Sequence, residues 1–415
     1  MIAHLKSLYE RSNISWPNTM IPFVIVVFLS CSGQNKDPGE STKTSLDPKY
    51  INDSTLVFDQ QYQKSVFGFI RNKTLELLSS DTSFRSIDNQ WNSARMEVIL
   101  ENCIDPIVRN FWLHVVVKDQ LENYGIKNTD AIMSTFYKNS TDSTSIREVR
   151  QLYYSDLEGR KGHTIVPYKT IGPFSLDAHI FFPDGHKKMN DAPAIVLFHG
   201  GSWYQGKPEW MFGSCKRYAS LGIVAIAIEY RLFDRNGVTP LECISDAKSA
   251  IRWVRKNADD LGIDPNKIVA SGFSAGGHLI ACAAMLNILD ELGEDTTISS
   301  IPNALIFSSS CFDPTLDSWF VKQVETRYPA KSVSPIHAVR SNLPPSLVIH
   351  GTEDRMCPFR TADKFAQSMS KAGNRCELYQ LQGATHFYFF EKKYRDEAIQ
   401  SEEKFLASLG FLSRN

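Results

Sequence analysis

The chain has 415 residues, of which 42% are hydrophobic and 22% are charged, a composition typical of a globular protein rather than a disordered or fibrous one. Its 45 basic and 46 acidic residues leave a formal net charge of -1, which gives no general reason to expect nucleic acid or an acidic surface as partner. The length allows one large domain and something smaller.

The cysteines show neither a CxxC pair nor the spacing of metal ligands, so we expect no metal site. They are Cys31, Cys103, Cys215, Cys243, Cys282, Cys311, Cys357 and Cys376. Scattered cysteines of this kind are usually small buried apolar residues. If Cys31 is modified, the number that remains is odd, and no disulfide framework is implied.

Residues 20–29 are almost wholly apolar and follow a polar segment that carries Lys6 and Arg11. This run is too short to span a bilayer but matches the core of an export signal. The order of charged, apolar and small residues before Cys31 resembles a bacterial lipoprotein signal, in which the cysteine becomes the lipidated first residue. A general secretory signal cut nearby, or a membrane anchor left in place, is the alternative interpretation.

The lipoprotein resemblance implies an organisation for the first part of the chain. Residues 1–30 would be the export signal, Cys31 the lipidated residue, and residues 31–49 a flexible linker. The protein would then be exported to the cell envelope, in the outer membrane or periplasm, with membrane contact only through its lipid anchor.

Residues 50–145 form a segment that favours helices. Apolar residues recur over residues 91–117 at close to a 3.6-residue period, and Pro106 should end or kink that stretch. We expect a shorter helix over residues 129–137 and a polar linker over residues 138–145. The segment is a small helical domain, a spacer from the membrane or a cap over an active site, and the sequence does not decide among these.

Residues 160–415 alternate between strand and helix patterns, which predicts an α/β fold with a doubly wound, mostly parallel sheet. Alternation over residues 175–182 predicts an exposed antiparallel strand. Continuous apolar runs predict strands buried on both faces at residues 194–198, 222–228, 267–270, 304–307 and 346–349. Helices are expected over residues 241–258 and 360–372, and from His278 to Leu286.

The stretch Gly272-Phe273-Ser274-Ala275-Gly276 lies between a predicted strand and a predicted helix. This strand, turn and helix context is the one in which a Gly-x-Ser-x-Gly motif presents a nucleophilic serine above a sheet. Glycines two positions to either side let the backbone approach itself closely. Ser274 is therefore the candidate nucleophile, against the alternative of a serine in an ordinary glycine-rich turn.

A serine nucleophile needs a base and a carboxylate that holds the base, in the chain order Ser, Asp or Glu, His. Four histidines follow Ser274 in the chain: His278, His337, His350 and His386. His278 lies on the helix that leaves the elbow, and His350 precedes its nearest acidic candidates. His386 is the candidate base because it is the only histidine after Asp354.

Asp354 is the favoured acid because Gly351-Thr352 forms a turn directly after a buried strand, which holds the carboxylate rigidly. The other candidate acids are Glu353, Asp313 and Asp317. For the oxyanion, Ala275 supplies one amide donor and the His199-Gly200-Gly201 loop supplies another, from Gly200 or Gly201. His199 then has a structural role, and Trp203 packs the loop or lines the pocket.

Several motifs together resemble the α/β-hydrolase esterases, in particular the acetyl-xylan and feruloyl esterase-like and hormone-sensitive-lipase-like branches. They are residues 199–203, 229–232, 246–255, 262–265, 272–278 and 350–354, within a resemblance that covers about residues 165–410. The resemblance implies a triad of Ser274, Asp354 and His386, with Gly200, Gly201 and Ala275 around the oxyanion. Ser202 stands where many relatives have a third glycine.

We therefore expect a serine hydrolase that cleaves carboxylic esters through an acyl-enzyme and needs no metal or organic cofactor. The resemblance and the expected location favour short acyl esters on carbohydrate, such as acetylated xylan, and small-molecule esters are nearly as well favoured. The alternatives are an amide or peptide hydrolase, prolyl-oligopeptidase-like or arylformamidase-like, and a non-catalytic surface binding protein on a hydrolase scaffold.

Overall fold

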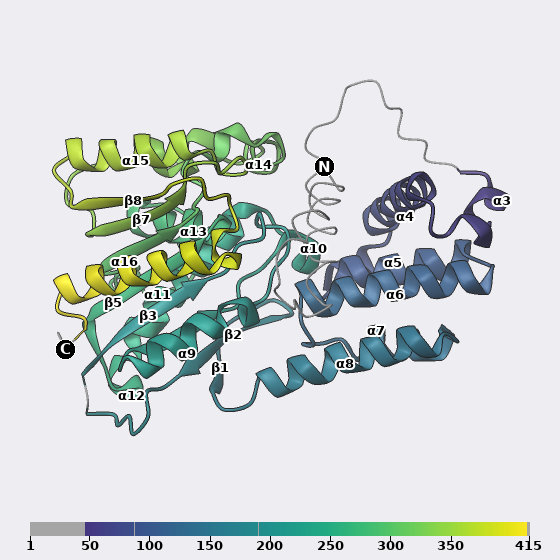
Figure 1. Cartoon of the computed structure of the whole chain (residues 1–415), viewed down its shortest axis with the longest axis horizontal. Coiled ribbons are helices and arrows are strands. Elements are labelled where there is room, and N and C mark those ends of the chain that lie inside the picture. Colours follow the sequence, from purple (N-terminus) through teal and green to yellow (C-terminus); the bar gives the residue numbers. More distant parts are fainter. Residues whose placement is uncertain (1–45, 87, 190, 413–415) are drawn as a thin grey trace. The chain divides into compact units, whose positions relative to one another are not determined.

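The computed structural model describes residues 46–412 except residues 87 and 190 (Figure 1). The expected export signal, Cys31 and most of the expected linker lie outside the described residues. At the end of that linker, α3 (Pro48–Ile51) begins, and the Asp47 side chain caps it by accepting a hydrogen bond from the Lys49 amide.

A mostly parallel sheet of eight strands forms the centre of the C-terminal part (Figure 1). In chain order the strands are β1 (Thr164–Ile171), β2 (Phe174–Phe181), β3 (Ala192–Phe198), β4 (Val224–Ile228), β5 (Ile263–Phe273), β6 (Ala304–Ser308), β7 (Ser346–Gly351) and β8 (Cys376–Leu381). Their order across the sheet is β1-β2-β4-β3-β5-β6-β7-β8. β2 pairs antiparallel with β1 and β4, and every other pair is parallel.

Helices cover both faces of the sheet, because successive side chains of a strand point to opposite faces. On β3, Val196 belongs to the core that includes α11 (Pro240–Lys256), α13 (Ala275–Met285) and α15 (Phe359–Lys371). Its neighbours Ile195 and Leu197 belong to the core on the other face, which includes α9 (Phe212–Ser220) and α16 (Lys392–Ser408). The predicted doubly wound α/β class is therefore confirmed.

Two features of the sheet differ from the prediction. β2 was expected to be exposed, but its last four residues are buried because β1 pairs along its outer edge and Phe212 packs on His179 and Phe181. β1 and β8 were not predicted as strands at all. β8 is an edge strand with only one of its six residues buried, so it carries no continuous apolar run.

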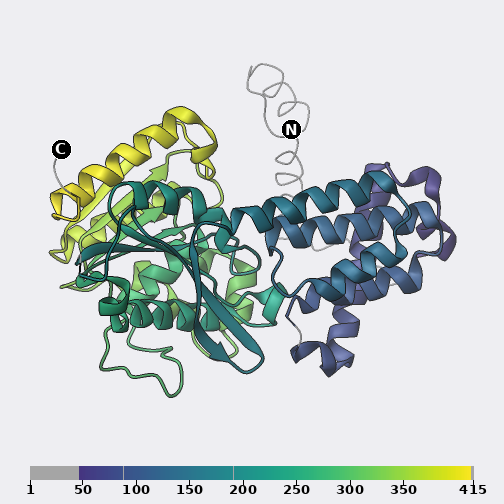
Figure 2. The same cartoon turned by 90° about the horizontal axis from the view of Figure 1, so that it is seen from below.

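The helical part before the sheet comprises five longer helices that lie side by side (Figure 2). They are α4 (Gln60–Ser80), α5 (Gln90–Asn102), α6 (Pro106–Asn123), α7 (Asp130–Asn139) and α8 (Ser143–Gly159). Their apolar faces share one hydrophobic core, with Tyr62, Ile99, Leu113 and Phe136 among its most deeply buried residues. Among the described helices, none combines the length and apolar character that a bilayer crossing requires.

Pro106 ends the helical stretch as predicted: α5 stops at Asn102 and Pro106 opens α6, with Asp105 capping the amides of Ile107 and Val108. The prediction of a polar linker over residues 138–145 is wrong. α7 runs to Asn139, and Asp142 caps α8, whose first residues are Ser143 and Thr144. Serine, threonine and aspartate favour helix caps as strongly as loops, so the polar composition is compatible with both.

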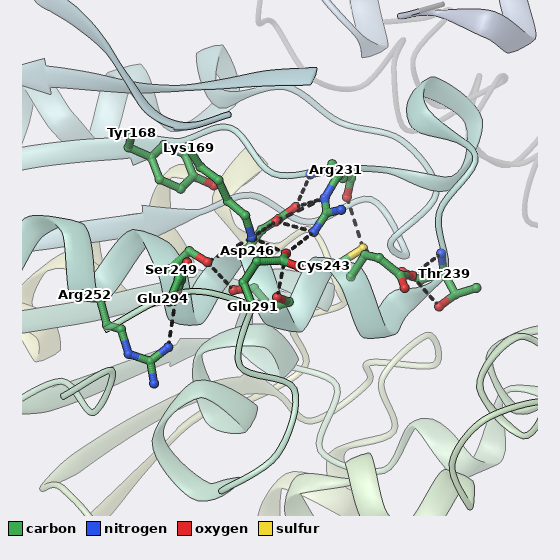
Figure 3. Close-up of polar contacts among 12 residues, drawn as sticks. Tyr168, Lys169, Arg231, Thr239, Cys243, Asp246, Ser249, Arg252, Glu291 and Glu294 are labelled. Carbon is green, nitrogen blue, oxygen red and sulfur yellow. Dashed lines mark hydrogen bonds and ion pairs between the residues drawn. The ribbon is translucent and has the colours of Figure 1, made fainter. Parts of the chain in front are cut away.

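A buried ionic cluster around Asp246 ties four segments of the α/β part together (Figure 3). The Asp246 side chain is fully buried; Lys169 of β1 lies 2.7 Å from its Oδ1, and Arg231, after β4, lies 2.8 Å from the same oxygen. Glu291, after α13, accepts from Lys169 and Arg231 at 2.6 and 2.9 Å and from Ser245 at 3.0 Å. The two cations thus face two carboxylates, as a buried charge requires.

Candidate active site

Ser274 lies at the tight turn between β5 and α13, with φ 54° and ψ -117°. A non-glycine residue in this region of the Ramachandran map stores on the order of 1–3 kcal/mol of strain, which the surrounding structure must hold. The turn is held by the Ser274 amide, which donates to the Ser308 carbonyl at 3.0 Å. A Cβ on Gly272 would lie 2.4 Å from the Gly276 carbonyl carbon, so the turn has no room for a side chain there.

His386 and Asp354 lie next to this serine, although they come from the loops that follow β8 and β7. The His386 Nε2 atom is 3.1 Å from the Ser274 Oγ atom, and its Nδ1 atom is 2.8 Å from Asp354 Oδ2. All three side chains are largely buried. The structure therefore brings the three residues that the sequence singled out into one continuous hydrogen-bonded chain.

Asp354 is held by hydrogen bonds on both carboxylate oxygens. Its Oδ1 accepts from the amides of Met356 and Cys357, each at 2.9 Å, and its Oδ2 also lies 3.2 Å from His350 Nε2. Burial works to raise the pKa of Asp354, but hydrogen bonds from His350 and His386 outweigh it and hold the pKa well below its ordinary value. The carboxyl group is therefore an anion at neutral pH.

His350 was not predicted to contact the candidate acid, yet its side chain reaches the same carboxylate. Its Nε2 also lies 2.7 Å from the Cys357 carbonyl, so this nitrogen carries the proton and donates. Its Nδ1 is buried and has no hydrogen-bond partner among the described residues. His350 opens the motif His350-Gly351-Thr352-Glu353-Asp354, but nothing in its spacing distinguished a contact with Asp354 from a contact with the sheet.

The glycine loop, residues 199–207 between β3 and the short helix η3 (Pro208–Met211), borders Ser274. A Cβ on Gly200 would lie 3.1 Å from Ser274 Cβ and 2.7 Å from the Phe273 ring, so the loop backbone packs directly on the elbow. Within the described part of the chain, the amides of Gly200, Gly201 and Ala275 donate no hydrogen bond. Ala275 also opens α13, where the helix presents its positive end.

His278 and His199 lie in packed surroundings. His278 accepts from Trp203 Nε1 at 3.1 Å and faces the Val333 carbonyl at 2.8 Å, and burial lowers its pKa to about 4. His199 stacks on Tyr230, and burial also lowers its pKa to about 4. Both imidazoles are therefore neutral at pH 7, which agrees with the structural roles expected for His199 and Trp203.

Two of the competing acids, Asp313 and Asp317, have other hydrogen-bond partners. Asp317 caps α14 (Ser318–Val324) by accepting from the Trp319 and Phe320 amides. Asp313 accepts from the Thr315 hydroxyl. Of the four candidate acids, Asp354 is the one hydrogen-bonded to His386.

Comparison with known proteins identifies the family. The family model BD-FAE matches residues 178–369. The chain is 31% identical over 215 residues to Esterase LipC of Mycobacterium tuberculosis and 28% identical over 220 residues to isoprenylcysteine alpha-carbonyl methylesterase ICME of Arabidopsis thaliana. These matches cover 47% and 48% of this chain and 53% and 51% of the relatives, so the chain spans about half the length of the curated relatives it matches.

Among solved structures, esterase 2 of Thermogutta terrifontis is 39% identical, with a TM-score of 0.59 over 62% of this chain and 98% of that one. Structures of that esterase include forms bound to propionate and to butyrate, and a form phosphorylated by paraoxon. The sheet, the elbow and these matches define the class of protein. The chain belongs to the α/β-hydrolase esterases, a family of carboxylic ester hydrolases.

Proposed function

We propose that this protein hydrolyses short-acyl carboxylic esters, with Ser274 as nucleophile, His386 as general base and Asp354 as the carboxylate that orients the base. The observation that carries the proposal is the hydrogen-bonded chain from Ser274 Oγ through His386 to Asp354 Oδ2, built on a strained elbow. This constellation is recognised by geometry and role, and it accelerates acyl transfer on many folds.

In the first step His386 Nε2 takes the Ser274 hydroxyl proton as Oγ attacks the ester carbonyl carbon. The tetrahedral intermediate collapses, the imidazolium returns the proton to the departing alkoxide, and an acyl-enzyme on Ser274 remains. Water then attacks the acyl-enzyme by the same route, with His386 again accepting and returning a proton. Asp354, an anion throughout, fixes the imidazole tautomer and stabilises the positive charge that forms on it.

The oxyanion of the tetrahedral intermediate is assigned to backbone amides. Gly200 packs on Ser274, Ala275 follows Ser274, and Gly201 is the next residue of the glycine loop; the amides of all three have no partner in the described chain. Such preorganised donors each contribute on the order of 3 kcal/mol to the stability of the transition state. No metal or organic cofactor enters this scheme, and the expectation that none is required stays a prediction.

A short acyl group is supported by the related esterase 2, whose structures hold propionate and butyrate. Carbohydrate as the alcohol part, as in acetylated xylan, rests on the family resemblance and on the expected export. A panel of p-nitrophenyl acetate, butyrate and octanoate, acetylated xylan and an aminoacyl-proline amide tests the substrate class. Turnover of the amide without turnover of any ester would reject ester hydrolysis.

The nucleophile is tested separately with a fluorophosphonate probe. We expect the wild-type protein to be labelled and Ser274→Ala to lose both labelling and ester turnover. Undiminished turnover by Ser274→Ala would reject the triad and would favour a binding protein whose fold only resembles an enzyme.

We also propose that the mature protein is an exported lipoprotein anchored through Cys31. The support is the order of charged, apolar and small residues at positions 6–31. Expression of the full chain with Cys31→Ala should move the protein from the membrane fraction to the soluble fraction and abolish palmitate incorporation. Unchanged membrane association and no labelling of the wild type would reject the anchor.

A further inference from the structure

The last turn of α6 is capped by the segment that begins at the far end of the glycine loop. A helix end leaves its last four carbonyls without intrahelical donors. In α6 the first of these, at Gln120, accepts from the Tyr124 amide at 2.9 Å. The other three accept from the segment after β3: Leu121 from Lys207 Nζ at 2.6 Å, Glu122 from Trp210 Nε1 at 3.3 Å and Asn123 from the Gly206 amide at 3.0 Å.

Of these three contacts, the one from the charged Lys207 side chain is the strongest. Its side chain is buried, and its ammonium group pairs with Asp156 of α8 at 2.7 Å while it donates to the Leu121 carbonyl. A cation at a helix C-terminus is favoured by the helix dipole, and a buried ammonium is costly without such partners. The position of Lys207 is therefore defined by two helices of the N-terminal part.

Gly206 transmits this constraint to the oxyanion amides. Its φ is 134°, and a Cβ there would lie 2.3 Å from His199 Nδ1 and 2.8 Å from the Gly200 carbonyl oxygen. Gly200 in turn packs on Ser274. Gly206 thus contacts both the end of α6 and the residues after β3 that carry the proposed oxyanion amides.

A second bond ties the same loop to α6 from its other side. The hydroxyl of Tyr124, the C-cap residue that follows α6, donates to Asp234 Oδ2 at 2.9 Å. The Asp234 amide donates to the Tyr204 carbonyl at 3.2 Å, and the Tyr204 amide donates to the Gly201 carbonyl at 3.0 Å. The glycine loop is therefore held from two directions by one helix end.

We propose that Lys207 is a positioning residue for ester hydrolysis. By fastening the glycine loop to the end of α6, it keeps the Gly200 and Gly201 amides where the oxyanion forms. The helical part of the chain is then a component of the catalytic apparatus, because α6 and α8 supply the anchor. This inference rests on the ester hydrolysis proposed above.

The test compares Lys207→Met with Lys127→Met in the full-length protein. Lys127 is the matched control because it also joins the helical part to the sheet, through Asp177 and Glu229, but it makes no contact with the glycine loop in the described structure. Both variants lose one partly buried cation and keep a side chain of similar length. Thermal unfolding shows the temperature range in which each variant is folded, and kinetics are measured below it.

With p-nitrophenyl acetate, we expect Lys207→Met to lower kcat about 10-fold with KM changed less than about 2-fold, since oxyanion donors act on the transition state. The inhibition constant of a trifluoromethyl ketone, which forms a tetrahedral adduct on the serine, should rise by a similar factor. Lys127→Met should keep kcat within about 2-fold of the wild type, and Lys207→Arg should recover most of the activity.

Equal kcat values for Lys207→Met and Lys127→Met would overturn the inference, while absence of turnover in the wild type would instead reject the proposed function. If Lys207→Met does not fold, Trp210→Phe carries the test, because it removes the Nε1 donor to the Glu122 carbonyl and keeps an aromatic ring beside His199. Its kcat should fall about 2- to 3-fold at constant KM, as expected for a partial displacement of the donors. An unchanged kcat would overturn the inference in that case as well.

Discussion

Two aspartates in this molecule have equally buried side chains but face different basic residues. Asp246 lies between Lys169 and Arg231, and Asp354 lies between His350 and His386. Lysine and arginine carry a fixed positive charge at neutral pH, whereas a histidine can be neutral or positively charged. The first aspartate therefore makes a permanent ion pair, while the second is placed to stabilise a positive charge that forms on a histidine.

This difference distinguishes a carboxylate suited to a structural ion pair from one suited to assist a general base, although both are buried. A carboxylate that serves a general base must be charged before its partner is, so that it stabilises the imidazolium when it forms. Asp354 meets this condition because hydrogen bonds from His350 and His386 hold its pKa well below the ordinary value, whereas Asp246 lies between the charged side chains of Lys169 and Arg231. Substitution of each aspartate by asparagine should consequently affect different properties.

The largest effect is expected for Asp354→Asn. The neutral amide cannot stabilise the imidazolium and favours the wrong tautomer of His386, so kcat should fall about 10³- to 10⁴-fold. Steady-state hydrolysis of p-nitrophenyl acetate measures this loss. Glu353→Gln, one residue earlier, is the control and should keep kcat within about 2-fold; equal losses in the two variants would contradict the assignment of the acid.

Asp246→Asn should change stability instead of chemistry. It leaves Lys169 and Arg231 with one carboxylate between them, and breaking a buried ion pair costs about 3–5 kcal/mol in the free energy of unfolding. Urea denaturation measures the loss, and kcat of the folded variant should stay near that of the wild type. The same substitution at Asp260, whose pair with Lys188 is exposed, should leave the denaturation midpoint unchanged.

The pH dependence of stability sharpens the comparison further. Because the pKa of folded Asp354 lies below the ordinary value of 3.8, its contribution is complete above that value and is lost as pH falls through the folded pKa. The difference in unfolding temperature between the wild type and Asp354→Asn should be constant from about pH 7 to 5 and shrink below about pH 4. A difference that grows on acidification would show that the pKa is raised.

The smallest effect is expected at His350. His350→Gln keeps an N–H donor near the Cys357 carbonyl and Asp354, so kcat should remain within about 3-fold of the wild type. His350→Leu removes that donor and should cost about 1–3 kcal/mol of stability, since the buried carbonyl loses its partner. Kinetics and thermal unfolding of both variants check this; loss of activity in both, at full stability, would give His350 a direct catalytic role.

Much of the catalytic part could be predicted because its signals are local. The buried strands β3 to β7 are continuous apolar runs, and the elbow requires glycines at fixed distances from Ser274. The order of Ser274, Asp354 and His386 also follows from how such a sheet is wound. The edge strands β1 and β8 were missed because edge strands need not carry a continuous apolar run.

The helical part shows the opposite case. Helices over residues 91–137 could be predicted from their period and from Pro106. The helix α8 was not predicted, because a polar stretch such as residues 138–145 suits a helix cap and a linker equally. The bond between Lys207 and the Leu121 carbonyl joins residues that are 86 positions apart. No local pattern encodes such a pairing.

By itself, the sequence determined the family, the elbow and the candidate residues for the reaction, since these depend on residue type and short spacing. Only the tertiary structure decided which histidines face Asp354, which carboxylate pairs with fixed cations, and where the end of α6 lies. These contacts arise when segments distant in the chain pack together, because burial forces every charge and every free carbonyl to find a partner.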